Sequence, residues 1–77
     1  MLSDKETDKR IGACLKEERE KRELSLEYVG KSLGVTRATV HFWETGRNAI
    51  SASALKKYCD VLNLPLDKFA KKVFNNL

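Results

Sequence analysis

The segment Leu26–Arg47, LEYVGKSLGVTRATVHFWETGR, decides the fold because it places small and apolar residues where two short helices must cross at a tight turn. Gly30 lies one turn before the break between the helices, where a close crossing leaves room only for a small residue. Gly34 can adopt the positive φ that ends a helix. Thr36 can then cap the following helix with its hydroxyl oxygen. The segment therefore predicts two short helices joined at Gly34.

Each of these helices carries an apolar stripe, with residues spaced three and four apart. The stripes and the turn between them contain Val29, Leu33, Val35, Val40 and Trp43. The rest of the chain shows helical spacing and no convincing strand pattern, so we predict an all-α fold. The expected helices cover about residues 7–22, 26–33 and 37–45, a stretch that starts after Ser51, and residues 66–75. Ser3 with Glu6 can form a capping box that would start the first helix earlier.

The length and charge of the chain limit its class. At 77 residues we expect one small domain over residues 7–77 after a flexible tail over residues 1–6. No apolar run of about 18 residues and no signal peptide are visible, which favours a cytoplasmic protein with no membrane partner. Residues 1–30 carry 7 Lys/Arg and 8 Asp/Glu, whereas residues 31–77 carry 8 and 3. A basic half of this kind suits a polyanionic partner.

The sequence offers little for catalysis or metal binding. Cys14 and Cys59 are too few and too isolated from other ligands for a zinc site, and we expect them to be reduced, small apolar residues. His41 has no nucleophile or carboxylate at a motif spacing. We therefore expect no metal, no cofactor and no enzymatic activity.

Residues spread from Ile11 to Phe69 carry a family resemblance. They are Ile11, Leu15, Arg19, Leu24, Ser25, Gly30, Leu33, Gly34, Val35, Val40, the run Trp43–Asn48, Ser51, Leu55, Leu62, Leu66 and Asp67. Together they resemble the Cro/lambda-repressor helix-turn-helix family of the XRE type. The resemblance implies a compact five-helix, lambda-repressor-like DNA-binding domain whose second and third helices form the helix-turn-helix. It also implies double-stranded DNA as a partner and a homodimer, at least on DNA.

Three residues depart from the family pattern. Leu26 stands where the family often has a glutamine that touches the DNA backbone and supports the recognition helix. Glu23 replaces a common glycine, which predicts a strained or differently shaped turn. Ile50 replaces a common proline. The change at Leu26 affects one expected DNA contact and not the fold.

The helix over residues 37–45 is the expected reader of DNA bases. If Val40 and Trp43 are buried, the 100° step per residue turns other side chains outward, and the expected base contacts are Arg37, Ala38, His41 and Phe42. Arg37 can reach guanine O6 and N7 or a phosphate, and Ala38 can meet a thymine methyl. His41 faces either the groove, a phosphate or plain solvent. Phe42 can contact thymine methyls, pack back onto the protein or meet a protein partner.

Phosphate contacts are expected from helix ends and from the following loop. The residues suited to them are Thr36, Thr39, Arg47 and Asn48, because hydroxyls, amides and guanidinium groups donate to phosphate oxygens.

Two sets of charged residues are predicted to form ion pairs. The family resemblance implies a salt bridge between Arg19 and Glu44, which would join the first helix to the end of the third. The charged run over residues 16–23 is predicted to be a solvated face with pairs such as Glu17–Lys21 and Glu18–Arg22.

The last helix is the expected dimer interface. Its apolar residues are Phe69, Val73, Phe74 and Leu77, which form more apolar surface than a small monomer comfortably exposes. In the alternative reading, Phe69 and Val73 only close the five-helix core.

The leading hypothesis from the sequence is a sequence-specific, double-stranded DNA-binding transcriptional regulator, most simply a repressor or Cro-like protein of a phage or mobile element. The alternative is a protein-interaction module, such as an antirepressor, adaptor or antitoxin, that keeps the fold with reduced DNA binding. The apolar residues Leu26 and Phe42 are the features that favour the alternative.

Overall fold

The computed structural model describes residues 3–75, which contain helices and no strand. The helices are α1 (Asp4–Lys21), α2 (Leu26–Leu33), α3 (Arg37–Thr45), α4 (Ala52–Val61) and α5 (Leu66–Phe74). The predicted all-α, five-helix architecture is confirmed, and α2 and α3 have the predicted bounds.

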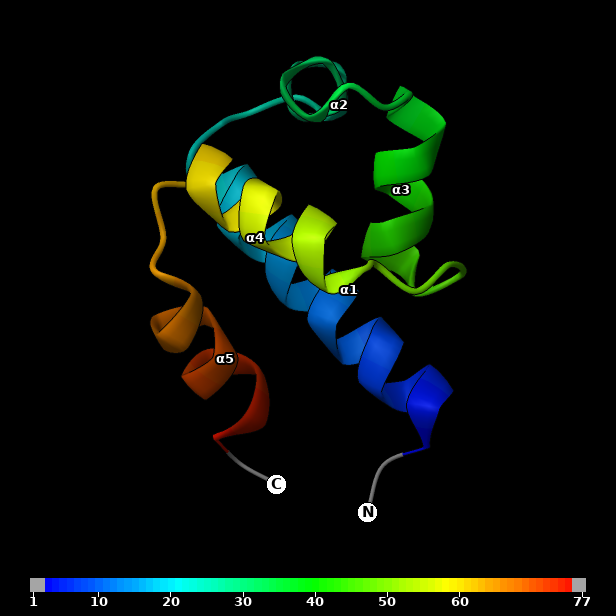
Figure 1. Ribbon diagram of the computed structural model, residues 1–77, viewed down its shortest axis with the longest axis vertical. Coiled ribbons are helices and arrows are strands. Elements are labelled where there is room, and N and C mark those ends of the chain that lie inside the picture. The colour runs from blue at the N-terminus through cyan, green and yellow to red at the C-terminus, as the bar shows by residue number, and fades with distance from the viewer. Residues whose placement is uncertain (1–2, 76–77) are drawn as a thin grey trace.

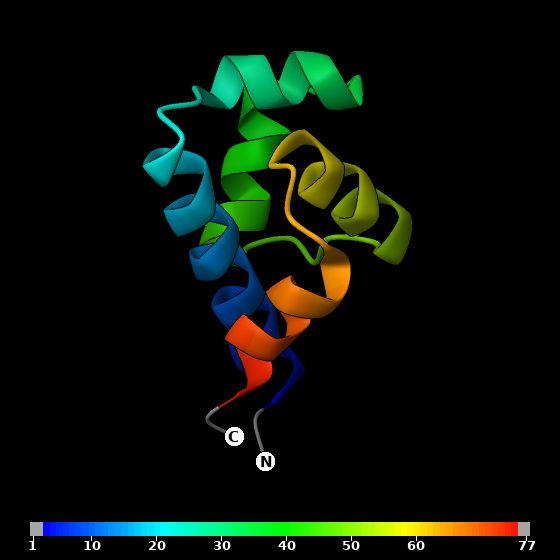
Figure 2. The same cartoon turned by 90° about the vertical axis from the view of Figure 1, so that its left-hand side faces the viewer.

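The helices form a bundle of 34 × 23 × 21 Å. α2 lies across one end of the longest axis, α3 descends from it, and α5 lies toward the other end (Figures 1 and 2). α1 packs against both α3 and α5, while α2 packs against α3 and α4. The two helices of the predicted helix-turn-helix are thus supported from behind by α1 and α4.

The core takes residues from every helix. The side chains of Leu15, Val29, Val40, Tyr58, Cys59, Leu62, Phe69 and Val73 are almost fully buried. Cys14 and Cys59 are both free cysteines. Burial is the main cause that raises the pKa of each thiol. Both thiols therefore stay protonated near neutral pH, and the two cysteines serve as small, uncharged residues.

The first helix begins at Asp4, the earlier start that the predicted Ser3–Glu6 capping box allowed. Ser3 caps α1, because its Oγ accepts a hydrogen bond from the Glu6 N–H at 3.1 Å and donates one to Glu6 Oε1 at 3.2 Å. Residues 4–6, which the sequence assigned to the flexible tail, are therefore helical. At the other end of the chain, α5 ends at Phe74 rather than residue 75.

The charged run of α1 is not a uniformly solvated face. The expected pairs are present, with Glu17–Lys21 at 3.5 Å and Glu18–Arg22 at 2.8 Å. Glu18, however, is buried, because α5 packs over this part of α1 and brings Lys72 into an ion pair with it. The hydrogen bond from Lys72, with a further bond from Arg22, lowers the pKa of Glu18 to about 2. Glu18 therefore links α1 to α5.

The turn after α1 is strained at Glu23, as the departure from glycine predicts. Glu23 has a φ of 55°, in the left-handed region that disfavours a residue with a Cβ. The Leu24 N–H closes this turn by donating to the Arg19 carbonyl oxygen at 3.2 Å. The turn directs the chain from α1 into α2.

Candidate nucleic-acid interface

The turn between α2 and α3 is built from local signals. Ser25 caps α2 by accepting from the Tyr28 N–H at 3.0 Å, and Thr36 caps α3 by accepting from the Thr39 N–H at 3.1 Å. Gly34 ends α2 with a φ of 74°. A Cβ on Gly30 would lie 2.8 Å from the Val35 carbonyl oxygen, which is too close for a side chain. The predicted roles of Gly30, Gly34 and Thr36 are confirmed.

A second close approach, between α1 and α3, was not predicted. Gly12 is buried where α1 crosses the end of α3, and a Cβ on it would lie 2.6 Å from the Glu44 carbonyl oxygen and closer still to that of Trp43. Backbone meets backbone at this crossing. The sequence offers no local sign of the contact, because Gly12 lies inside a charged helix far along the chain from its neighbours.

Arg19, Glu44 and Tyr58 form an interhelical brace behind α3. Arg19 donates from Nε to Glu44 Oε2 at 2.7 Å and from Nη2 to Oε1 at 3.0 Å. Its Nη1 donates to the Leu24 carbonyl oxygen at 2.7 Å. The Tyr58 hydroxyl also donates to Glu44 Oε2. The ion pair implied by the family resemblance is thus present, whereas the part played by Tyr58 was missed.

The brace is buried, and its contacts raise the pKa values of Arg19 and Tyr58. The Glu44 side chain is 2% exposed and that of Arg19 is 10% exposed. The bond to Glu44 is the main cause that raises the pKa of Arg19. Burial, followed by the bond to Glu44, raises the pKa of Tyr58. Arg19 therefore stays charged and Tyr58 stays protonated, the forms in which both donate to Glu44 and attach α3 to α1 and α4.

The opposite side of α3 is open. Arg37, Ala38 and His41 are exposed, as the helical wheel predicts, while Val40 and Glu44 are buried. Arg37 is not unpartnered, because its Nε donates to Glu27 Oε1 of α2 at 2.6 Å. The sequence did not predict this ion pair.

Phe42 is only half-buried, and its ring packs against polar neighbours on the outer side of α3. The Arg47 guanidinium carbon lies 4.6 Å from the centre of the Phe42 ring, a cation–π arrangement. The centres of the His41 and Phe42 rings are 5.9 Å apart. The Asn48 N–H donates to the Phe42 carbonyl oxygen at 3.2 Å. Phe42 therefore supports the loop that carries Arg47 and Asn48.

The residues expected to contact phosphates lie at both ends of α3. Arg47 and Asn48 are exposed in the loop after α3, and Thr36 is exposed before it. Thr36 Oγ1 and Thr39 Oγ1 lie 2.9 Å apart and share one hydrogen bond, in which either hydroxyl can donate. This bond uses one of the two hydroxyl protons, so one remains free to donate to another oxygen.

Comparisons with known proteins agree with this geometry. A helix-turn-helix family model matches residues 15–69, which include α2, α3 and most of the buried core. The chain belongs to the Cro/lambda-repressor-like (XRE) helix-turn-helix family. Uncharacterized HTH-type transcriptional regulators of Sinorhizobium medicae (strain WSM419) and Rhizobium meliloti (strain 1021) are each 32% identical to it over 62 residues. This match covers 80% of the chain but only 45% of each relative.

Solved structures share the fold. Two crystal structures of the clp gene regulator ClgR from Corynebacterium glutamicum superpose on the chain with TM-scores of 0.86 and 0.85, each at 18% sequence identity. The first match covers 91% of this chain and 74% of that one, and the second covers 92% of both. At this level of identity the similarity shows the arrangement of the helices alone.

The predicted dimer interface of this helix-turn-helix domain needs correction. Phe69 is 2% exposed and Val73 is fully buried, because α5 packs against α1 and α4 and both residues belong to the core of the same chain. They cannot also cover a partner, and the alternative reading, in which they close the core, is confirmed. Phe74 is 43% exposed. Leu77 lies outside the described residues.

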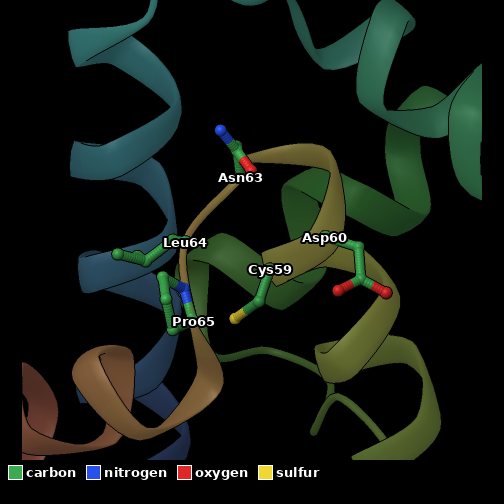
Figure 3. A pocket seen from close by; sticks show the side chains of 5 residues that line it. All are labelled: Cys59, Asp60, Asn63, Leu64 and Pro65. Atoms are coloured by element: carbon green, nitrogen blue, oxygen red, sulfur yellow. The ribbon is translucent and has the colours of Figure 1, made fainter.

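The described residues also form a hollow away from α3. A hollow of about 240 Å³ lies at the end of α4, lined by Cys59, Asp60, Asn63, Leu64 and Pro65 (Figure 3). No residue of α3 lines it, and Asp60, its acidic lining residue, is paired with Lys56. Over residues 3–75 no group of three or more His, Cys, Asp or Glu could hold a metal ion. Within the same residues, none of the helices has the length and apolar character needed to span a membrane.

Proposed function

We propose that this chain is a sequence-specific, double-stranded DNA-binding transcriptional regulator that reads the major groove with α3. The observation that carries the proposal is the two-sided character of α3. One side is locked by Val40 and the buried Glu44, and the other presents Arg37, Ala38 and His41 to solvent. A helix held in this way can enter the major groove, where arginine can donate to guanine and a small residue permits close approach.

The charge distribution supports a polyanionic partner. The segment from residue 31 onward carries 8 Lys/Arg against 3 Asp/Glu, and Glu44 is already neutralised by Arg19. Arg47, held over Phe42, and Asn48 extend from the loop at one end of α3, while Thr36 lies at the other end. In the proposal these residues contact phosphates and fix the register of α3 on the duplex.

The proposed biological role is that of a repressor or Cro-like protein of a phage or mobile element, acting in the cytoplasm of a bacterial cell or infected host. The names of the two relatives support a regulator. Since the chain spans about 45% of their length, the proposal concerns the DNA-binding part of such a protein.

Two copies bind together on DNA in this proposal. One α3 reads only a short half-site, whereas two recognition helices can enter successive major grooves about 34 Å apart. The exposed Phe74, together with Leu66 at 39% exposure, remains as apolar surface on α5. Sedimentation of the chain with a selected duplex should give two chains per duplex. A single chain per duplex at saturating protein concentration would refute the pairing.

The features that favoured a protein-interaction module now have another explanation. Leu26 is half-buried and packs against the core, so its apolar character serves the fold. Phe42 packs beneath Arg47 and supports the loop that carries it. Neither residue needs a protein partner to account for it.

Selection from a randomised duplex pool, followed by titration at several salt concentrations, tests the proposal. We expect tight, salt-sensitive binding to the selected duplex. Arg47→Ala should weaken binding to all duplexes and reduce the magnitude of the slope of log affinity against log salt by about one. The matched control is Lys68→Ala, an exposed residue of α5, which should leave the slope unchanged. If no duplex binds even at low salt, the regulator is excluded, and capture of a protein would favour the adaptor.

A further inference from the structure

The contact between Glu27 and Arg37 joins the two helices of the helix-turn-helix on their solvent side. Glu27 is the second residue of α2 and Arg37 is the first residue of α3. Arg37 Nε donates to Glu27 Oε1 at 2.6 Å, and the two side chains are 63% and 64% exposed. An ion pair this exposed adds little stability, because solvent screens it. Stability therefore does not account for the pair.

Glu27 is well placed to act as a fixed acceptor. Ser25 caps α2 and fixes where the helix starts, so Glu27 lies in the first turn, near the free N–H groups. The hydrogen bond from its own backbone N–H, followed by the bond from Arg37, lowers the pKa of Glu27. The carboxylate is thus ionised at neutral pH and available to hold a guanidinium group.

The bond to Glu27 uses Nε of Arg37 and leaves the two terminal nitrogens of the guanidinium free to bind a ligand. Nε, nearest the backbone, is occupied by Glu27, and among the described residues no partner is found for Nη1 or Nη2. These two nitrogens carry the parallel N–H groups that a guanidinium can direct at O6 and N7 of one guanine. An arginine restrained at Nε also has less rotamer freedom to lose when it binds.

We propose that Glu27 is a specificity-determining positioning residue, which holds Arg37 so that its terminal nitrogens meet one guanine in the major groove. This inference rests on the proposed DNA-binding function. A carboxylate on a DNA-facing surface repels phosphates and weakens binding to every duplex. The positioning of Arg37 compensates for that cost only at a site with guanine in the right place. Glu27 therefore raises the ratio of specific to non-specific binding by both effects.

The experiment measures discrimination at single guanines. Each guanine of the selected duplex is replaced in turn by 7-deazaguanine, which lacks N7. Wild-type protein should lose about tenfold in affinity at one guanine, and Arg37→Ala should show no loss there. In Glu27→Ala the loss at the same guanine should fall below about threefold, while binding to a scrambled duplex is unchanged or tighter. Glu27→Gln keeps an acceptor oxygen and should retain more of the discrimination than Glu27→Ala.

A matched control removes the same charge elsewhere. Glu20→Ala, at an exposed position of α1, should keep the wild-type discrimination, and thermal melting of each variant verifies its fold. The inference is overturned if Glu27→Ala keeps the full loss at the guanine that Arg37 reads. It is also overturned if Glu27→Ala weakens selected and scrambled duplexes equally, as a purely structural role would. If wild-type protein binds no duplex at all, the proposed function itself is refuted. The selection with wild-type protein gives this result before any variant is made.

Discussion

Replacing Glu44 tests the interhelical brace, because this one carboxylate accepts hydrogen bonds from two buried groups. In Glu44→Ala, the Arg19 guanidinium, whose side chain is 10% exposed, keeps only its bond to the Leu24 carbonyl oxygen. An uncompensated buried charge of this kind costs about 3 kcal/mol. The Tyr58 hydroxyl loses its acceptor as well, which adds about 1 kcal/mol. We therefore expect a loss of about 4 kcal/mol in the free energy of unfolding.

That loss is large for a chain of this size. A domain of 77 residues has a total stability of roughly 4–12 kcal/mol, so Glu44→Ala should lower Tm by about 15 °C or more, or prevent folding. Glu44→Gln keeps the shape and one carbonyl oxygen and should lose less, about 2 kcal/mol. Thermal and urea unfolding followed by circular dichroism measure both variants.

The control for Glu44 is Asp60, whose exposed ion pair with Lys56 has a distance of 2.6 Å, close to the 2.7 Å between Arg19 and Glu44. Asp60→Ala should cost less than about 0.5 kcal/mol, because solvent screens an exposed pair within one helix. If Glu44→Ala melted within a few degrees of Asp60→Ala, the brace would contribute nothing and the reasoning from burial would be refuted.

Three further predictions concern the joins between helices. Because Lys72 depresses the pKa of Glu18 to about 2 in the folded chain, the stability from this group should be complete above about pH 5 and lost as the pH falls toward 2; a melting series across this range should be flatter in Glu18→Gln, and an unchanged acid dependence would contradict the linkage. Glu23→Gly should raise stability by about 1 kcal/mol by relieving the positive φ, whereas Glu23→Ala should gain nothing, and equal melting of the two would argue against strain. Gly12→Ala should cost about 3 kcal/mol or more, because the added Cβ meets the Trp43 carbonyl oxygen; urea unfolding close to that of wild type would show that α3 can move away at no cost.

The helix-turn-helix itself was predictable because its signals are local. Ser25 and Thr36 cap the helices that follow them, and Gly34 supplies the left-handed turn, all within a few residues of the structure they determine. The exposed face of α3 followed from helix geometry once Val40 was assigned to the core. The sequence left the start of α1 open between Ser3 and Thr7, because this charged segment has no apolar stripe to place its first turn, and the structure selects the cap at Ser3.

The contacts that the sequence did not predict join residues on different helices. The amphipathic stripe with Phe69 and Val73 has the same pattern whether it faces its own core or a partner, so the sequence could not separate the two. Glu18 resembled its solvated neighbours because Lys72, which draws it into the structure, lies on α5. Likewise, nothing in the sequence pairs Glu27 with Arg37, since both are polar, exposed and on different helices.

The central claim is that the exposed side of α3 reads DNA bases, and a base-by-base affinity profile of the selected duplex tests it most directly. Each base pair is substituted singly, and the loss of affinity is measured for wild-type protein, Arg37→Ala and the control Lys68→Ala. We expect wild-type protein and Lys68→Ala to give the same profile, and Arg37→Ala to lose about 1–3 kcal/mol of discrimination at one position only. A flat wild-type profile, or an Arg37→Ala profile identical to that of wild type at every position, would contradict the claim.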